Sequence, residues 1–114
     1  MCLLYQAEFQ EKRKRFMTNR TQNTQPLFKL GQIVATPGAL ELLTENNVSP
    51  STLLVRHVSG DWGDMDDEDK KSNDDAVKYG NRTFSAYVLP DGDKVWIITE
   101  SDRSYTTILK PEEY

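Results

Sequence analysis

The sequence has 114 residues, a length that fits a single domain. Only 37% of the residues are hydrophobic and 28% are charged, with a formal net charge of −4 at pH 7. Cys2 is the only cysteine, which excludes a disulfide within the chain and a thiolate metal cluster. No stretch approaches the roughly 20 apolar residues of a membrane span, and no signal-peptide core is present. We therefore expect a cytoplasmic protein that is neither exported nor embedded in a membrane.

Residues 1–26 form a basic leader, in which five basic side chains face two acidic ones and give a charge of +3. Residues 18–26 (TNRTQNTQP) contain nothing that could be buried, which predicts a disordered linker. Residues 27–114 hold 9 basic and 16 acidic side chains and carry −7. We predict a disordered basic leader followed by one acidic domain.

The domain is predicted to begin with a strand over residues 27–35 that bends near Gly31. A helix should follow, because Thr36 can cap it and Pro37 suits the first helical position. Its face of Ala39, Leu40 and Leu43 would be buried.

A second helix is predicted to start in the same way at Ser49 and Pro50. Residues 55–58 (VRHV) could instead form a strand, so both alternatives stay open there. A third helix within residues 65–79 has a polar face dense in carboxylates and should end at Gly80.

From residue 83 the hydrophobic period changes to two, which predicts three strands at 83–89, 95–99 and 104–109. Residues 90–93 (PDGD) form a tight turn between the first two. The predicted order is β-α-α-α-β-β-β. We expect an α+β fold with two or three helices packed on one face of a small antiparallel sheet.

Residues 56–64 (RHVSGDWGD) form the first candidate functional segment. They place His57, Trp62, Asp61 and Asp64 between glycines in a predicted loop, where functional residues are common. In the structural alternative, His57 and Trp62 close the core while the aspartates cap the next helix.

Residues 99–107 (TESDRSYTT) form the second candidate segment. They bring Glu100, Asp102 and Arg103 together with several hydroxyls at a hairpin tip. In the structural alternative, a carboxylate pairs with Arg103 in an ordinary turn, an interaction that contributes about 0–1 kcal/mol.

An acidic run covers the third predicted helix and the loop before it. Its members are Asp61, Asp64, Asp66, Asp67, Glu68, Asp69, Asp74 and Asp75. Asp64, Asp66 and Glu68 have the spacing of a calcium loop, but Asp69 occupies the position where that loop needs glycine. The run is therefore interpreted as a solvated acidic face, or as a surface that meets a basic partner or imitates a nucleic-acid backbone.

Several chemistries lack their sequence signals. The chain has no P-loop, no dinucleotide-binding glycine pattern and no Gly-x-Ser-x-Gly elbow. One histidine and one cysteine do not make a zinc site. We expect no metal, no cofactor and no direct nucleic-acid binding by the acidic domain, since phosphate contact needs clustered lysine and arginine.

Four segments carry a resemblance to a known group of proteins: residues 31–38 (GQIVATPG), 56–63 (RHVSGDWG), 96–107 (WIITESDRSYTT) and 109–114 (LKPEEY). In these segments the chain resembles a family of short bacterial proteins of plasmids and other mobile elements, loosely labelled plasmid-related proteins. The resemblance brings no established activity. It implies an accessory role on a mobile element, and such proteins often counter host defence systems.

The order of helices before an antiparallel meander is similar to that of barnase/RelE-like small ribonucleases and toxins. In such an enzyme His57 or Glu100 would act as base and Arg103 would stabilise phosphoryl charge, with Asp102 beside them. The sequence departs from that pattern, because Arg103 stands where the pattern has a catalytic histidine and Ser85 where it has a glutamate.

The function that the sequence favours is a non-catalytic accessory protein that binds a protein with a basic surface and inhibits a host defence or nucleic-acid-binding protein. A ribonuclease or toxin acting on RNA is the alternative. The residues expected to meet the partner are Asp61, Trp62, Asp64, Asp66, Asp67, Glu68, Asp69, Asp74 and Asp75. The sequence leaves the oligomeric state open.

Overall fold

The structure, a computed structural model, describes residues 3–4 and 26–114. Most of the predicted disordered leader thus lies outside the described residues; within it, β1 (Leu3–Leu4) is a two-residue strand. The domain continues in an order that confirms the predicted succession of elements and the α+β class. Its elements are β2 (Gln32–Ala35), α2 (Pro37–Glu45), α3 (Pro50–Val58), α4 (Asp67–Tyr79), β3 (Thr83–Val88), β4 (Lys94–Thr99), β5 (Tyr105–Leu109) and the 3-10 helix η1 (Pro111–Glu113).

The predicted caps Thr36 and Ser49 begin α2 and α3. The cap of α4 is Asp66, so the capping role predicted for Asp61 and Asp64 is wrong. The side chains of Thr36, Ser49 and Asp66 each accept a hydrogen bond from a backbone N–H of the following first turn, at 3.1, 3.3 and 2.8 Å. Gly80 ends α4 in the left-handed conformation, with φ 76°. Residues 55–58 belong to α3, so the strand alternative for them is wrong.

The sheet has the strand order β1-β2-β5-β4-β3. Strands β3, β4 and β5 form the predicted antiparallel meander, but β2 runs parallel to β5, so the sheet is mixed rather than wholly antiparallel. A parallel partner requires a long crossover, here all three helices and two strands, and no local pattern reveals which distant strand it is. The strand β2 also starts only after Gly31, whose φ is 67° and which packs against the backbone carbonyls of Arg103 and Ser104.

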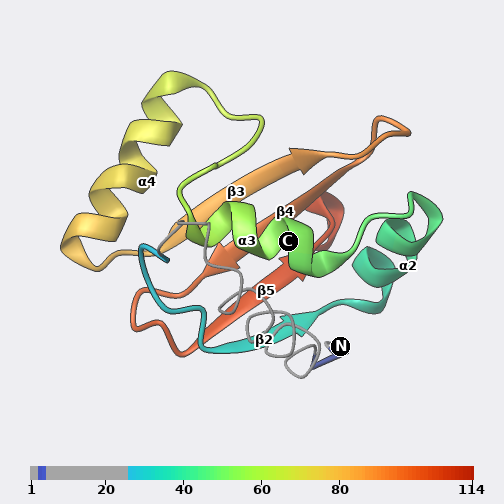
Figure 1. Ribbon diagram of the computed structural model, residues 1–114, viewed down its shortest axis with the longest axis horizontal. Coiled ribbons are helices and arrows are strands. Elements are labelled where there is room, and N and C mark those ends of the chain that lie inside the picture. Colours follow the sequence, from blue (N-terminus) through green and yellow to red (C-terminus); the bar gives the residue numbers. More distant parts are fainter. Residues whose placement is uncertain (1–2, 5–25) are drawn as a thin grey trace, which may run out of the picture.

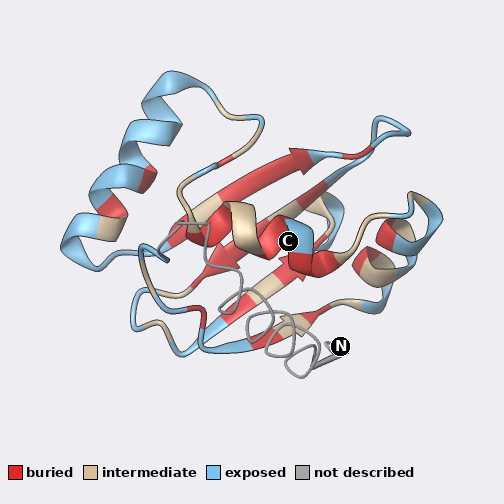
Figure 2. Ribbon diagram, viewed as in Figure 1, coloured by how far each residue is buried: buried red, intermediate tan, exposed pale blue. Residues whose placement is uncertain are grey.

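The core lies between α3 and one face of the sheet. Figure 1 shows α3 crossing that face and α4 lying beyond the edge strand β3. In Figure 2 the strands and α3 are mostly buried, while most of α4 is exposed. The core cluster joins helix and strand residues, among them Leu43, Leu53, Leu54, Tyr87, Val95, Ile97 and Ile108. The alternate strand residues point to the opposite face, where Phe84 and Trp96 are half-buried and Val88 and Tyr105 are exposed.

The free edge of β3 is closed by a side chain and by a short piece of backbone. The amide of Asn73 in α4 donates to the carbonyl of Phe84 at 2.7 Å and accepts from its N–H at 2.9 Å. Further along the strand, Ala86 donates to the carbonyl of Trp62 at 3.1 Å and accepts from the N–H of Asp64 at 2.7 Å. These contacts satisfy backbone groups that would otherwise form an open edge for another strand to pair with.

Gly63 makes this closure possible, and its replacement provides a test. Its φ is 81°, and a Cβ at this position would collide with the carbonyl of Ala86. We expect Gly63→Ala to lower the free energy of unfolding by more than about 2 kcal/mol, because strain and a backbone clash add. Urea denaturation measures the change.

Gly92→Ala is the matched control, since Gly92 has φ 94° but open space around it. It should cost only the conformational strain, about 1–2 kcal/mol. Equal losses for the two variants would contradict the close approach of Gly63 to β3.

Candidate functional site

His57 lies at the centre of a buried chain of hydrogen bonds. Its Nδ1 is 2.5 Å from the hydroxyl of Ser85, and its Nε2 is 2.9 Å from that of Thr99. Thr99 in turn contacts the hydroxyl of Thr106 at 2.8 Å, and Thr106 donates to the backbone carbonyl of Leu30 at 2.7 Å. All four side chains are fully buried. The chain therefore connects α3 to three strands and to the segment that leads into β2.

The direction of these bonds follows from the carbonyl at their end, which can only accept. Thr106 donates to it, Thr99 donates to Thr106, and Nε2–H of His57 donates to Thr99. Because burial keeps the imidazole neutral, Nδ1 carries no proton and accepts from Ser85. Burial lowers the pKa of His57 to about 3, and the nearby charge of Arg103 acts in the same direction.

Aromatic rings enclose the imidazole. The ring centroids of Phe28 and Trp62 lie 5.3 and 5.7 Å from that of His57, both edge-on. Trp62 is only 3% exposed, and its indole N–H donates to the carboxylate of Asp74 at 3.0 Å. Neither His57 nor Trp62 is thus accessible to a substrate or a partner, and both have a structural role.

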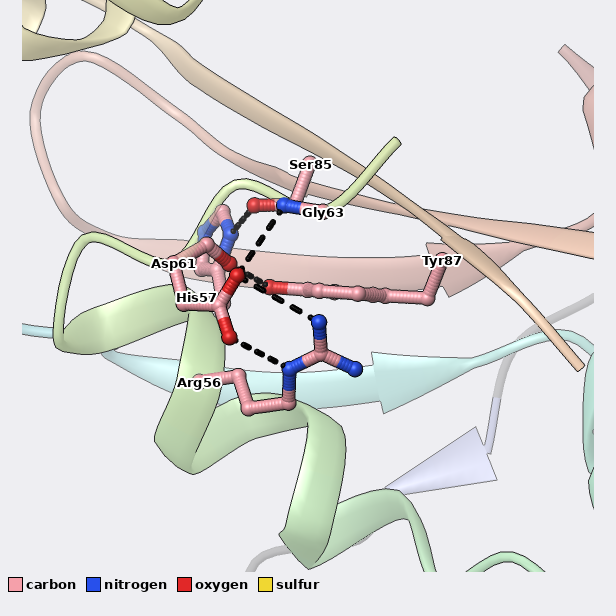
Figure 3. A network of polar contacts seen from close by, with 6 residues as sticks. All are labelled: Arg56, His57, Asp61, Gly63, Ser85 and Tyr87. Carbon is pink, nitrogen blue, oxygen red and sulfur yellow. Dashed lines mark hydrogen bonds and ion pairs between the residues drawn. The ribbon is translucent and has the colours of Figure 1, made fainter. Parts of the chain in front are cut away.

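Arg56 and Asp61 form an ion pair over the ring of Tyr87 (Figure 3). The Nε of Arg56 lies 2.7 Å from the carboxylate, and its guanidinium carbon lies 4.5 Å from the ring centroid. The hydroxyl of Tyr87 donates to the backbone carbonyl of Asp61 at 2.7 Å. The hydrogen bond from Arg56 lowers the pKa of the Asp61 carboxyl. This network fixes the turn after α3 against β3.

The second candidate segment, residues 99–107, is also used for structure. The guanidinium of Arg103 donates to the backbone carbonyls of Ala76, Asn81 and Glu100, at 3.2, 2.6 and 3.1 Å, and so binds the end of α4 to the hairpin. Asp102 accepts from the N–H of Ser104 at 3.0 Å, and hydrogen bonds to Ser104 lower its carboxyl pKa.

Two residues of the predicted ribonuclease set are used within the fold. The imidazole of His57 is fully buried, and the guanidinium of Arg103 is bound to backbone carbonyls. The ring of Phe28 packs against both, with its centroid 5.3 Å from that of His57 and 5.0 Å from the guanidinium carbon of Arg103.

Most carboxylates of the predicted acidic face interact with other groups of the fold. Asp64 pairs with Lys94 at 3.1 Å, and Asp75 lies 4.0 Å from Lys71 of its own helix. Asp66 caps α4, and Asp74 accepts from an indole. With Asp61 paired as well, five of the eight carboxylates have structural partners.

Three carboxylates remain, Asp67, Glu68 and Asp69, which form the first turn of α4. All three are exposed, and none has an ion pair within 4.0 Å among the described residues. The unpaired backbone N–H groups of a helix N-terminus stabilise negative charge at this position. We call Asp67, Glu68 and Asp69 the acidic turn.

An open groove lies beside the acidic turn, on the sheet face opposite α3. It has a volume of about 520 Å³. Its apolar lining includes Met65, Phe84 and Trp96, and the two aromatic rings lie 4.7 Å apart between centroids. Asp66, the N-cap of α4, and Asp69 in its first turn line the groove as well. Aromatic rings and carboxylates thus line the same groove.

Sequence reasoning assigned no function to Phe84 or Trp96, because it treated both as parts of strands. One signal was present in residues 94–98 (KVWII): the residues at 95 and 97 face the core, which turns Lys94 and Trp96 outward. A tryptophan on the outer face of an amphipathic strand indicates a contact surface.

Two further findings concern the described residues alone. Within residues 3–4 and 26–114 no three His, Cys, Asp or Glu side chains are arranged to hold a metal ion. In the same residues no helix is long and apolar enough to cross a membrane.

The buried imidazole makes stability depend on pH. The unfolded chain takes up a proton near pH 6.5, and the folded protein does so only near pH 3. Stability should therefore be complete above pH 6.5 and fall as the pH drops toward 3. Between pH 6.5 and 5, before most carboxylates titrate, we expect a loss of about 1.5 kcal/mol in urea denaturation.

His57→Gln should remove this pH dependence while lowering stability at pH 7. Nitrogen NMR of the wild-type imidazole should show the Nε2–H form throughout the range. If the imidazole of the folded protein gained a proton near pH 6.5, this result would contradict the buried, hydrogen-bonded position of His57.

In comparisons with known proteins, no protein-family model, no curated protein and no solved structure matches this sequence.

Proposed function

We propose that this protein acts without catalysis, by binding a protein partner that presents a basic surface to the acidic turn. The observation that carries the proposal is that Asp67, Glu68 and Asp69 keep their charges unpaired within the described chain, while the other carboxylates of the run are used to build the fold. The excess of acidic residues in 27–114 adds a long-range field of the same sign.

Such a surface affects the rate and the specificity of encounter more than the final affinity. Long-range attraction speeds approach of a basic protein and repels acidic ones. Because exposed charges are screened by salt, binding should weaken as ionic strength rises. In the proposed setting, the cytoplasm of a bacterial host carrying a mobile element, the partner is a host defence or nucleic-acid-binding protein, since such proteins present basic surfaces.

The ribonuclease alternative lacks a comparable observation. One of its two candidate bases, His57, is fully buried, and its phosphate ligand, Arg103, is bound to backbone carbonyls. Binding by the acidic turn needs no rearrangement of the fold, whereas catalysis by these residues would.

Neutralising the acidic turn tests the proposal. Asp67→Asn with Glu68→Gln removes two negative charges and introduces no positive charge, which would interact unfavourably with the helix dipole. Helix α4 should therefore persist, with a loss of stability below about 1–2 kcal/mol. We expect capture of partner proteins from a bacterial lysate at low salt to fall at least fivefold, quantified by mass spectrometry.

Glu41→Gln with Glu45→Gln in α2 is the matched control, since both side chains are exposed and the change in net charge is the same. It should leave capture unchanged. The proposal is wrong if both double variants capture the same proteins in the same amounts as the wild type.

A further inference from the structure

We propose that the groove beside the acidic turn binds a single arginine side chain from a basic segment of the partner protein. This inference rests on the proposed function and specifies its chemistry. The groove shares only Asp69 with the acidic turn, since Asp67 and Glu68 do not line it.

The apolar part of the groove fits the stem and the flat face of a guanidinium. Phe84 and Trp96 present half-buried rings on the sheet, and Met65 lines the groove beside them. An arginine stacks on aromatic faces more readily than a lysine, because its guanidinium is planar and weakly hydrated. A purely apolar side chain could also occupy these rings, but it would leave the carboxylates beside it without a partner.

The charges in the groove favour a cation. Its lining holds three carboxylates (Asp64, Asp66 and Asp69) and two cations (Arg82 and Lys94), a net charge of −1. Lys94 pairs with Asp64 at 3.1 Å, and the guanidinium of Arg82 donates to the neutral hydroxyl of Tyr114 at 2.6 Å. Asp66 and Asp69 line the groove without an ion pair among the described residues. An incoming guanidinium would meet both, and carboxylates bind its parallel N–H groups well.

The protein contains the same arrangement within its own fold. Arg56 lies 4.5 Å above the ring centroid of Tyr87 while its Nε contacts the carboxylate of Asp61 at 2.7 Å (Figure 3). The ring of Tyr87 and the carboxylate of Asp61 together hold the guanidinium of Arg56 beside β3. The groove, on the opposite face of the sheet, also combines aromatic rings with carboxylates.

A second copy of this chain is a poorer occupant. The whole chain carries −4, and residues 27–114, which form the groove, carry −7, so two copies would approach against their own net repulsion. A basic segment of another protein meets no such barrier.

The test is an NMR titration of the isotope-labelled full chain with a tripeptide that holds arginine between two serines. Matched peptides carry citrulline, which has the same shape without the charge, or lysine. We expect the arginine peptide to shift the indole signal of Trp96 and the amides of Asp66 and Asp69. The indole of Trp62, buried and bonded to Asp74, should not move.

The citrulline peptide should bind at least about fivefold more weakly, and the lysine peptide should also be weaker. Trp96→Val and, separately, Asp69→Asn should each weaken arginine binding at least about fivefold. Asp75→Asn, which removes a charge from α4 outside the groove, should not. Asp69 is exposed, so its variant keeps the test valid if Trp96→Val fails to fold.

Three outcomes would overturn the inference: equal binding of arginine and citrulline, shifts confined to residues outside the groove, or a Trp96 signal that moves on diluting the protein alone, which indicates a second copy. The fate of the proposed function is read separately. If the peptide fails but capture still depends on Asp67 and Glu68, only the groove inference falls. If the peptide binds but capture ignores those charges, only the proposed function falls.

Discussion

The hydrogen-bonded imidazole of His57 is the interaction on which the rest of the structure depends. A buried polar group is stable only when its partners are in place, so the neutral ring requires Ser85, Thr99 and Thr106 at fixed positions on three different strands. Those positions set the distance between α3 and the sheet. They also decide where the segment before β2 lies, because its carbonyl at Leu30 ends the chain of bonds.

Much of the fold could be predicted from local signals. Caps at Thr36 and Ser49 and the left-handed Gly80 locate the helices, and the change of period after residue 82 locates the meander, whereas the cap of α4 at Asp66 was not predicted. The parallel pairing of β2 with β5 could not be predicted, because it depends on where the crossover ends rather than on any residue in β2.

The candidate site was harder to predict than the fold. Residues 56–64 and 99–107 have the polar composition of functional loops, yet the structure uses them to bury His57 and to bind the end of α4 through Arg103. Whether a polar side chain is buried with partners or presented to a ligand depends on residues far away in the sequence. The surface that remains available is instead the acidic turn and the outward-facing Trp96.

The central place of the last strand has a consequence for synthesis. Strand β5 lies between β2 and β4, so β2 has no parallel partner until residues 105–109 have been synthesised. Until then the sheet cannot join β2 to the β3–β4 hairpin. We expect contacts that are distant in sequence to determine the folding rate.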